Sequence, residues 1–308
     1  MTVSRNRYLY HFIALITMTI WGTTYISTKV LICHGLTPVE IIFYRFSMAY
    51  VCIWPFSFHH LWAKTLKDEL LFVAAGLCGG SLYFLSENTA LGMTLASNVS
   101  LILCTAPIIT AFLYFFLNKG ERLKSSLIYG SLMALIGVAL VIFNGDVILK
   151  VNPLGDFLTL LAALMWAIYS LIVKHLGAGY PALLVTRKVF FYGLLTLIPV
   201  LPFSPVRFDT TVLFQPEVYG NLIFLGLVAS MLCYLMWNAA MKRLGVVRVT
   251  NYIYIGPVVT LVASHFLIHE RITAIALLGS AFILSGVYMA EKGLPSIKKI
   301  QRAVLKNR

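Results

Sequence analysis

The residue with the clearest chemical potential is Glu87, a carboxylate well inside an apolar segment. Tyr83 and Asn88 lie within about one helical turn of it. Charged side chains inside a bilayer are costly and usually face the interior of the helix bundle or a wet cavity. A buried carboxylate can exchange a proton, so Glu87 is a candidate for proton coupling or for recognition of a cation. A structural salt bridge to Lys29 or Arg45 is the alternative, and the sequence leaves both open.

Aromatic pairs at helical spacing occur in two other apolar segments. Trp21 and Tyr25 are four residues apart, and Trp166 and Tyr169 are three apart, so each pair lies on one face of a helix. Packing explains such pairs by default, but rings that line a cavity would suit an amphipathic or aromatic solute. Further polar residues in apolar segments are candidates for a substrate pathway or for hydrogen bonds between helices: Asn98, Tyr234, Asn238, Asn251 and Tyr254.

Basic residues and prolines inside the apolar segments are candidates for gating. Arg45 and Arg187 lie about two turns into their segments, where interior pairing, a scaffold role or binding of an anionic substrate would each explain them. Lys29 lies near the end of its segment, where a long side chain can reach the membrane surface. Pro107 and Pro257 each interrupt a segment and predict either a hinge or a static kink.

The sequence contains no arrangement typical of an enzyme. HExxH, GxSxG and a phosphate-binding glycine loop with lysine are all absent. The five cysteines fall in apolar segments without CxxC or metal-ligand spacing. We therefore expect no catalytic set, no metal and no cofactor, and the missing ATP site argues against a primary pump.

These residues belong to segments that must lie in a membrane. The chain has 308 residues, of which 60% are hydrophobic and 11% charged, whereas a soluble domain carries about 25% charged residues. A spanning helix needs about 20 mainly apolar residues, and such segments recur from end to end. The prediction is an all-α integral membrane protein with ten transmembrane helices: 8–33, 37–58, 69–91, 94–117, 125–144, 153–176, 181–202, 217–241, 247–268 and 272–291.

Short signals mark some of the boundaries. Thr37, Pro38 and Glu40 predict a helix cap, a first-turn proline and a capping box. Asn152 and Pro153 predict a similar start for the sixth helix.

The net charge of +13 predicts orientation rather than nucleic-acid binding, because the charges lie in short loops and the tail. The loops on one side of the membrane hold only three basic residues, Lys150, Arg207 and Arg271. The loops on the other side and the two termini hold a large excess of lysine and arginine. This bias predicts a multi-pass protein of the plasma membrane with both termini in the cytoplasm.

The two halves of the chain repeat the same ordered series of residues. Matched positions are Trp21 and Trp166, Lys29 and Lys174, Pro38 and Pro181, Arg45 and Arg187, Asn88 and Asn238, and Pro107 and Pro257. Five helices in each half is an odd number, so the second half must cross the membrane in the opposite direction. The predicted domains are two five-helix repeats, 8–144 and 153–291, and a basic cytoplasmic tail, 292–308. Inverted repeats are typical of secondary transporters with a binding site between the halves.

The repeated motifs also resemble a known family. They look like those of the EamA family, within the drug/metabolite transporter superfamily, over essentially the whole chain. The residues that carry the resemblance are Trp21-Gly22, Pro38 to Arg45, Pro107, Glu121-Arg122 and Glu270-Arg271. The resemblance implies ten helices arranged as a basket around a central cavity, and export of small metabolites. In the second half Ala167 follows Trp166 where the motif has glycine.

The predicted function is therefore secondary transport of small metabolites, such as amino acids or related amphipathic solutes, by alternating access. The expected partners are a small-molecule substrate, the lipid bilayer and protons as the coupling ion; the oligomeric state stays open, a monomer included. The alternative is a non-transporting membrane scaffold or assembly factor, or an intramembrane enzyme. A cavity between helices 1, 3 and 4 and helices 6, 8 and 9 favours transport, and a dry interior favours the scaffold.

Overall fold

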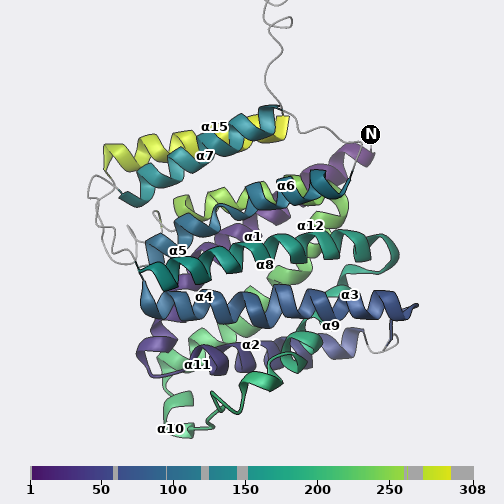
Figure 1. The fold of residues 1–308 in the computed structure, drawn as a ribbon, viewed down its shortest axis with the longest axis vertical. Coiled ribbons are helices and arrows are strands. Elements are labelled where there is room, and N and C mark those ends of the chain that lie inside the picture. The colour runs from purple at the N-terminus through teal and green to yellow at the C-terminus, as the bar shows by residue number, and fades with distance from the viewer. Residues whose placement is uncertain are drawn as a thin grey trace, which may run out of the picture.

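Long helices dominate the structure, a computed structural model that describes residues 2–57, 62–94, 96–118, 125–143, 152–259, 262 and 273–292. Figure 1 shows these helices side by side and roughly parallel. Within the described residues no strand occurs, and seven helices are long and apolar enough to cross a membrane. The protein is therefore an integral, multi-pass membrane protein.

The first part of the chain follows the predicted segments closely. The first and second are α1 (Thr2–Cys33) and α2 (Pro38–Ile53), which ends in a 3-10 turn, Trp54–Phe56. The third comprises α3 (Leu66–Gly76), a π-helical turn at Leu77–Ser81, and α4 (Leu82–Met93). The fourth is divided into α5 (Ala96–Leu103) and α6 (Ala106–Leu117), and the fifth is α7 (Ser125–Phe143).

The second part repeats this order. It begins with α8 (Pro153–Gly179) and α9 (Ala182–Leu195), followed by a 3-10 turn, Ile198–Val200, and short α10 (Thr210–Leu213). The eighth segment comprises α11 (Pro216–Ile223), a π-helical stretch at Phe224–Leu232, and α12 (Cys233–Leu244). The ninth begins with α13 (Val246–Thr250) and a 3-10 turn, Asn251–Ile255, and its later part lies largely outside the described residues. The last helix is α15 (Ala274–Lys292).

Local caps set two of the helix starts. The Thr37 side chain accepts a hydrogen bond from the Glu40 amide at 3.2 Å, and the Glu40 carboxylate accepts one from the Thr37 amide at 2.7 Å. The predicted capping box is thus confirmed. At α8, the Asn152 side chain accepts from the Gly155 amide at 3.0 Å, so this predicted start is confirmed as well.

A π-helical turn interrupts both the third and the eighth segment. Such turns widen the helix and change the partners of its carbonyls. In the third segment, the Gly79 carbonyl accepts a hydrogen bond from Tyr234 Oη at 2.6 Å. In the eighth, the Ala229 carbonyl accepts one from Trp21 Nε1 at 2.8 Å. The two widened turns therefore tie the first part of the chain to the second.

Contacts between the two parts are reciprocal. Helix α4 packs on α8 and α1 on α12; likewise α3 packs on α9, and α2 on the π-helical stretch. The fourth segment contacts the sixth through α6 and α8, and the equivalent ninth segment contacts the first, α1, in the same way. The fifth and tenth helices, α7 and α15, pack on each other, side by side at the top of Figure 1.

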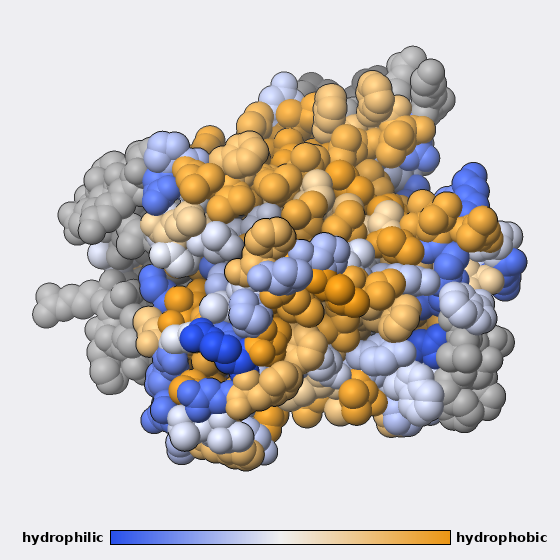
Figure 2. Space-filling model, turned by 60° about the horizontal axis from the view of Figure 1, so that its bottom comes forward, coloured by the Kyte–Doolittle hydropathy of each residue, from blue (hydrophilic) through white to orange (hydrophobic). Residues whose placement is uncertain are grey.

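Apolar side chains cover much of the surface. Figure 2 shows a broad hydrophobic area across the middle of one face, with most strongly hydrophilic residues towards the two ends. Large apolar side chains such as Phe112 and Phe116 on α6 and Ile136 on α7 are exposed. An apolar surface of this extent fits contact with lipid.

Glycines allow α7 and α15 to approach at backbone distance. A Cβ atom on Gly286 would lie 2.5 Å from the Gly130 carbonyl oxygen and 2.6 Å from the Ala134 amide nitrogen. A Cβ on Gly137 would lie 2.5 Å from the Gly279 carbonyl oxygen. Backbone atoms cannot turn aside as a side chain can, so a methyl group here must separate the helices.

We expect Gly286→Ala to destabilise the protein by about 1–3 kcal/mol, the usual cost of overpacking. The measurement is the thermal unfolding midpoint of the purified protein in detergent. The matched control is Gly220→Ala on α11, where nothing lies within 4 Å of the new methyl group. Equal midpoints for the two variants would contradict the close approach.

Candidate functional site

A cavity lies where α1, α2, α4, α5, α6, α8, α12 and the ninth segment converge. We call it the aromatic cavity. Helices 1, 3, 4, 6, 8 and 9 contribute to it, as expected of a transporter, and helix 2 contributes as well. The predicted site residues that line it are Trp21, Tyr25, Arg45, Tyr83, Glu87, Trp166, Tyr234 and Pro257.

Tryptophan and tyrosine rings in edge-on and tilted contact form its wall. The two matched tryptophans meet directly: the Trp21 and Trp166 ring centroids lie 5.3 Å apart at an interplanar angle of 84°. Tyr83 contacts Trp166 at 5.1 Å, and Tyr234 contacts Trp21 at 5.7 Å. Such pairs each contribute about 0.5–1.5 kcal/mol beyond their buried area, so the wall is held in one arrangement.

Glu87 is buried in this wall, 7% exposed, and Oε1 accepts a hydrogen bond from Tyr83 Oη at 2.8 Å. Arg45, only 2% exposed, lines the same cavity. Its Nε donates to Ser230 Oγ at 2.9 Å, and its guanidinium carbon lies 4.1 Å from the centroid of the Phe84 ring. Within the described part of the chain, neither charged group forms an ion pair. The cavity therefore holds an acidic and a basic group that are not in direct contact with each other.

Lys29 does not pair with Glu87, and that predicted alternative is wrong. Lys29 lies one turn beyond Tyr25 near the end of α1, where its side chain is exposed. A long ammonium side chain at a helix end reaches the membrane surface more cheaply than it enters the bundle.

Two of the predicted pathway residues form a brace between helices instead of lining the cavity. Tyr169 Oη donates to Asn238 Oδ1 at 2.8 Å, and Asn238 Nδ2 donates to Thr186 Oγ1 at 3.0 Å. All three side chains are buried, so this chain of bonds joins α8, α12 and α9.

Three other predicted pathway residues, Asn88, Asn251 and Tyr254, also lie outside the lining. Asn88 and Asn251 are buried, and within the described residues the Asn88 amide and Asn251 Oδ1 have no hydrogen-bond partner. Tyr254 packs in a separate cluster with residues of α7 and α15. The Asn98 side chain lies outside the described residues.

The predicted hinge prolines both follow a break in regular helix. Pro107 is the second residue of α6, just after the chain leaves α5. Pro257 follows the 3-10 turn of the ninth segment and lines the cavity with Gly256.

Several lining residues were not identified from the sequence, among them Met18, Thr24, Phe84, Leu103, Cys104 and Ile253. Met18 lies three residues before Trp21, so continuing that helical face would have found it. The sequence carries no comparable signal for Leu103 or Ile253, because both are ordinary apolar residues in apolar segments.

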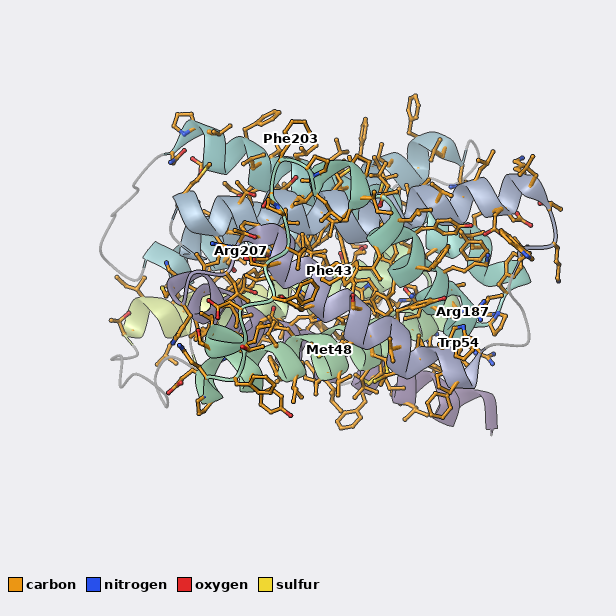
Figure 3. All side chains as sticks on the ribbon, turned by 90° about the horizontal axis from the view of Figure 1, so that it is seen from below. Phe43, Met48, Trp54, Arg187, Phe203 and Arg207 are labelled. Atoms are coloured by element: carbon orange, nitrogen blue, oxygen red, sulfur yellow. The ribbon has the colours of Figure 1, made fainter. Side chains whose placement is uncertain are left out.

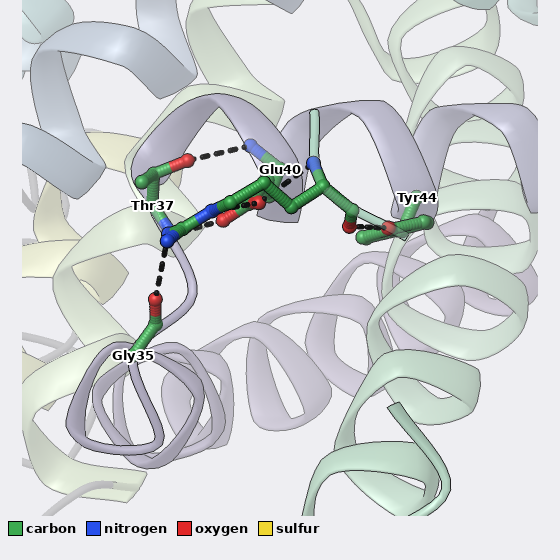
Figure 4. Close-up of polar contacts among 5 residues, drawn as sticks. Gly35, Thr37, Glu40 and Tyr44 are labelled. Carbon is green, nitrogen blue, oxygen red and sulfur yellow. Dashed lines mark hydrogen bonds and ion pairs between the residues drawn. The ribbon is translucent and has the colours of Figure 1, made fainter. Parts of the chain in front are cut away.

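Two polar clusters link the first half of the chain to the second. The Glu40 clasp joins the start of α2 to the loop before α10 (Figure 4). Glu40 Oε1 accepts from Arg207 N at 2.9 Å and from Arg207 Nε at 3.2 Å, and Tyr44 Oη donates to the Arg207 carbonyl at 2.6 Å. Nearby, hydrogen bonds from Thr211 hold the pKa of Asp209 below its usual value.

The Glu69 clasp joins α3 to α9 at the opposite end. Lys188 Nζ and Tyr192 Oη both donate to Glu69 Oε1, and the Lys188 side chain is only 4% exposed. Close by, the buried Arg187 side chain donates a hydrogen bond to the Ser57 carbonyl, just after α2. Arg187 is therefore inside the protein, as predicted, but it does not line the aromatic cavity. Figure 3 shows Arg207 in one half of the molecule's length and Arg187 in the other. Each clasp links a residue of the first half to one of the second.

Comparison with known proteins identifies the family. The profile of the EamA-like transporter family matches residues 9–143 and again residues 153–291. The chain belongs to this family. The family resemblance seen in the sequence is confirmed.

Curated relatives of this EamA-like transporter carry transporter names. It is 27% identical to an uncharacterized transporter of Archaeoglobus fulgidus, over 91% of this chain and 96% of that protein. It is 28% identical to a probable amino-acid metabolite efflux pump of Escherichia coli, over 92% and 94% of the two chains. A probable terminal-alkyne amino-acid exporter of Streptantibioticus cattleyicolor is 28% identical, over 73% and 74%.

The fold of this EamA-like transporter also matches a solved crystal structure. The TM-score is 0.75 at 17% identity, and the match covers 92% of this chain and 98% of the other. At that identity the match establishes the fold only.

Proposed function

We propose that this EamA-like transporter exports small metabolites, amino acids or related amphipathic solutes, across the plasma membrane by alternating access. The observation that carries the proposal is the aromatic cavity, where Trp21 from one half meets Trp166 from the other. A solute bound there contacts both halves, so a movement of one half against the other can expose it to either side. A packed scaffold has no need of such a cavity.

The proposed architecture is ten helices in two inverted repeats, 8–144 and 153–291, followed by a basic tail at 292–308. The two separate family matches, the paired π-helical turns and the reciprocal helix contacts support this division. The excess of basic residues in the loops on one side supports cytoplasmic termini.

The two clasps supply the proposed gates. Each is a set of hydrogen bonds between the halves, and they lie at opposite ends, so releasing one while keeping the other opens one side only. Pro107 and Pro257, each beside a helix break, are the proposed hinges.

Amino acids are the leading solutes because two relatives are named a probable amino-acid metabolite efflux pump and a probable terminal-alkyne amino-acid exporter. Protons are the proposed coupling ion and Glu87 the proposed coupling group. Glu87 is suited to this because it is an ionisable group buried beside the solute.

The test is solute flux by the purified protein in proteoliposomes. Solutes are chosen by comparing the culture medium of cells with and without the gene, and those that accumulate outside are loaded into the liposomes. We expect the protein to move at least one of them at least tenfold faster than empty liposomes. Flux equal to that of empty liposomes for every such solute would refute the proposal.

A further inference from the structure

We infer that the aromatic cavity binds a zwitterionic α-amino acid with a large apolar side chain, holding its ammonium group on Glu87 and its carboxylate on Arg45. The inference rests on the proposed function and names the substrate class of that site.

Two opposite charges buried in one cavity without an ion pair are the starting point. A buried charge that lacks a partner is unfavourable, and proteins usually pair such groups. Glu87 and Arg45 are 7% and 2% exposed, both line the cavity, and neither forms an ion pair within the described residues. A ligand that carries both charges can satisfy both groups at once.

Arg45 is arranged to receive a carboxylate. Its Nε is occupied by Ser230 Oγ, and the ring of Phe84 supports the guanidinium plane. No hydrogen bond to Nη1 or Nη2 is formed within the described part of the structure. A guanidinium with free Nη donors can bind a carboxylate through two hydrogen bonds.

Trp166 supplies a second donor in the same wall. Its indole Nε1 is buried and finds no acceptor among the described residues, although Trp166 lines the cavity. By contrast, Trp21 Nε1 is already bonded to the Ala229 carbonyl. An unbonded buried donor on a residue of the cavity wall favours a ligand that brings an acceptor.

Glu87 is arranged to receive an ammonium group. Tyr83 occupies Oε1, while Oε2 has no hydrogen-bond partner in the described part of the chain. The rings of Tyr83, Tyr25 and Trp21 line the same space, and aromatic faces attract cations. A primary ammonium group can therefore bond Oε2 and contact these rings.

An α-amino acid carries both charged groups on one carbon atom. Bound between Glu87 and Arg45, it would leave its side chain among the aromatic rings of the wall. Those rings favour a large apolar side chain over a small or polar one.

The test is competition binding to the purified protein, with labelled L-phenylalanine as the probe. The competitors are L-phenylalaninamide, which keeps the ammonium group but has no carboxylate, and N-acetyl-L-phenylalanine, which keeps the carboxylate but has no ammonium group. We expect each competitor to bind the wild-type protein at least tenfold more weakly than L-phenylalanine.

Variants assign each charge to its partner, with direct binding of each compound measured by calorimetry. We expect Glu87→Gln to weaken L-phenylalanine and the amide at least tenfold and the acetyl compound less than twofold. Arg45→Gln should weaken L-phenylalanine and the acetyl compound and spare the amide. Trp166→Phe should show the same pattern as Arg45→Gln, with a smaller loss. Unchanged binding of one analogue shows that the variant is folded.

Matched controls remove charges from the exposed surface. Glu217→Gln on α11 and Lys67→Gln on α3 should bind all three compounds as the wild type does. The inference is overturned if the wild type binds neither L-phenylalanine nor L-leucine, if it does not prefer the zwitterion, or if each variant weakens both analogues equally. If the protein then moves an uncharged solute in proteoliposomes, the inference has failed but the proposed function stands. The proposed function itself fails only if no solute is moved.

Discussion

Replacing Glu87 by glutamine is expected to abolish the dependence of transport on a pH gradient. Glutamine has nearly the same shape and can still accept the hydrogen bond from Tyr83 Oη, but it cannot bind and release a proton at cellular pH. The protein should therefore stay folded. In everted membrane vesicles with an acidic lumen, the ratio of solute uptake with the gradient to uptake without it should fall to about one.

The ratio is the useful measurement because it compares each variant with itself, at a solute concentration where uptake without the gradient is still above background. Glu217→Gln, on the exposed face of α11, is the matched control and should keep the wild-type ratio. An unchanged ratio in Glu87→Gln would exclude this residue as the coupling group, even if the solute bound more weakly.

Replacing Lys188 by methionine is expected to cause the largest loss of stability, about 3–5 kcal/mol. The Lys188 and Glu69 side chains are 4% and 12% exposed, so the variant leaves a buried carboxylate without its cation. Tyr192 alone would remain to donate a side-chain hydrogen bond to Oε1. The measurement is the thermal unfolding midpoint of the purified protein.

A double variant separates the cost of an unpaired charge from that of lost packing. Because neither charge stays buried in Lys188→Met with Glu69→Met, most of the lost stability should return. Lys67→Met, at an exposed position of α3, should have little effect. A double variant as unstable as the sum of the two single variants would contradict the role of the ion pair.

The apolar segments and the starts of α2 and α8 were predicted because they depend on local signals. Apolar length identifies the segments, and Thr37 with Glu40 marks the start of α2 through bonds that span only three residues. The π-helical turns could not be predicted in this way. Each is tied to a distant donor, such as Tyr234 for the turn at Gly79, which lies 155 residues away.

The chemistry of the site was predicted in part. The sequence pointed to Glu87, Arg45, Trp21 and Trp166, because polar and paired aromatic residues stand out among apolar ones. It left Lys29 and Arg45 as alternative salt-bridge partners for Glu87, and the structure separates them: Lys29 is exposed, and Arg45 lies in the cavity. It also placed Tyr169 and Asn238 on the substrate pathway, whereas they bond to each other.

By itself, then, the sequence determined the membrane class, the order of the segments, the repeated motifs and the family. Only the tertiary structure decided which polar groups face the cavity and which meet across the halves, as Glu40 meets Arg207 and Glu69 meets Lys188. The physical reason is the solvent. In water, a polar stripe reveals which face of a helix is outside. In lipid both the outer face and the core are apolar, so the rotation of each helix is set by packing against distant partners.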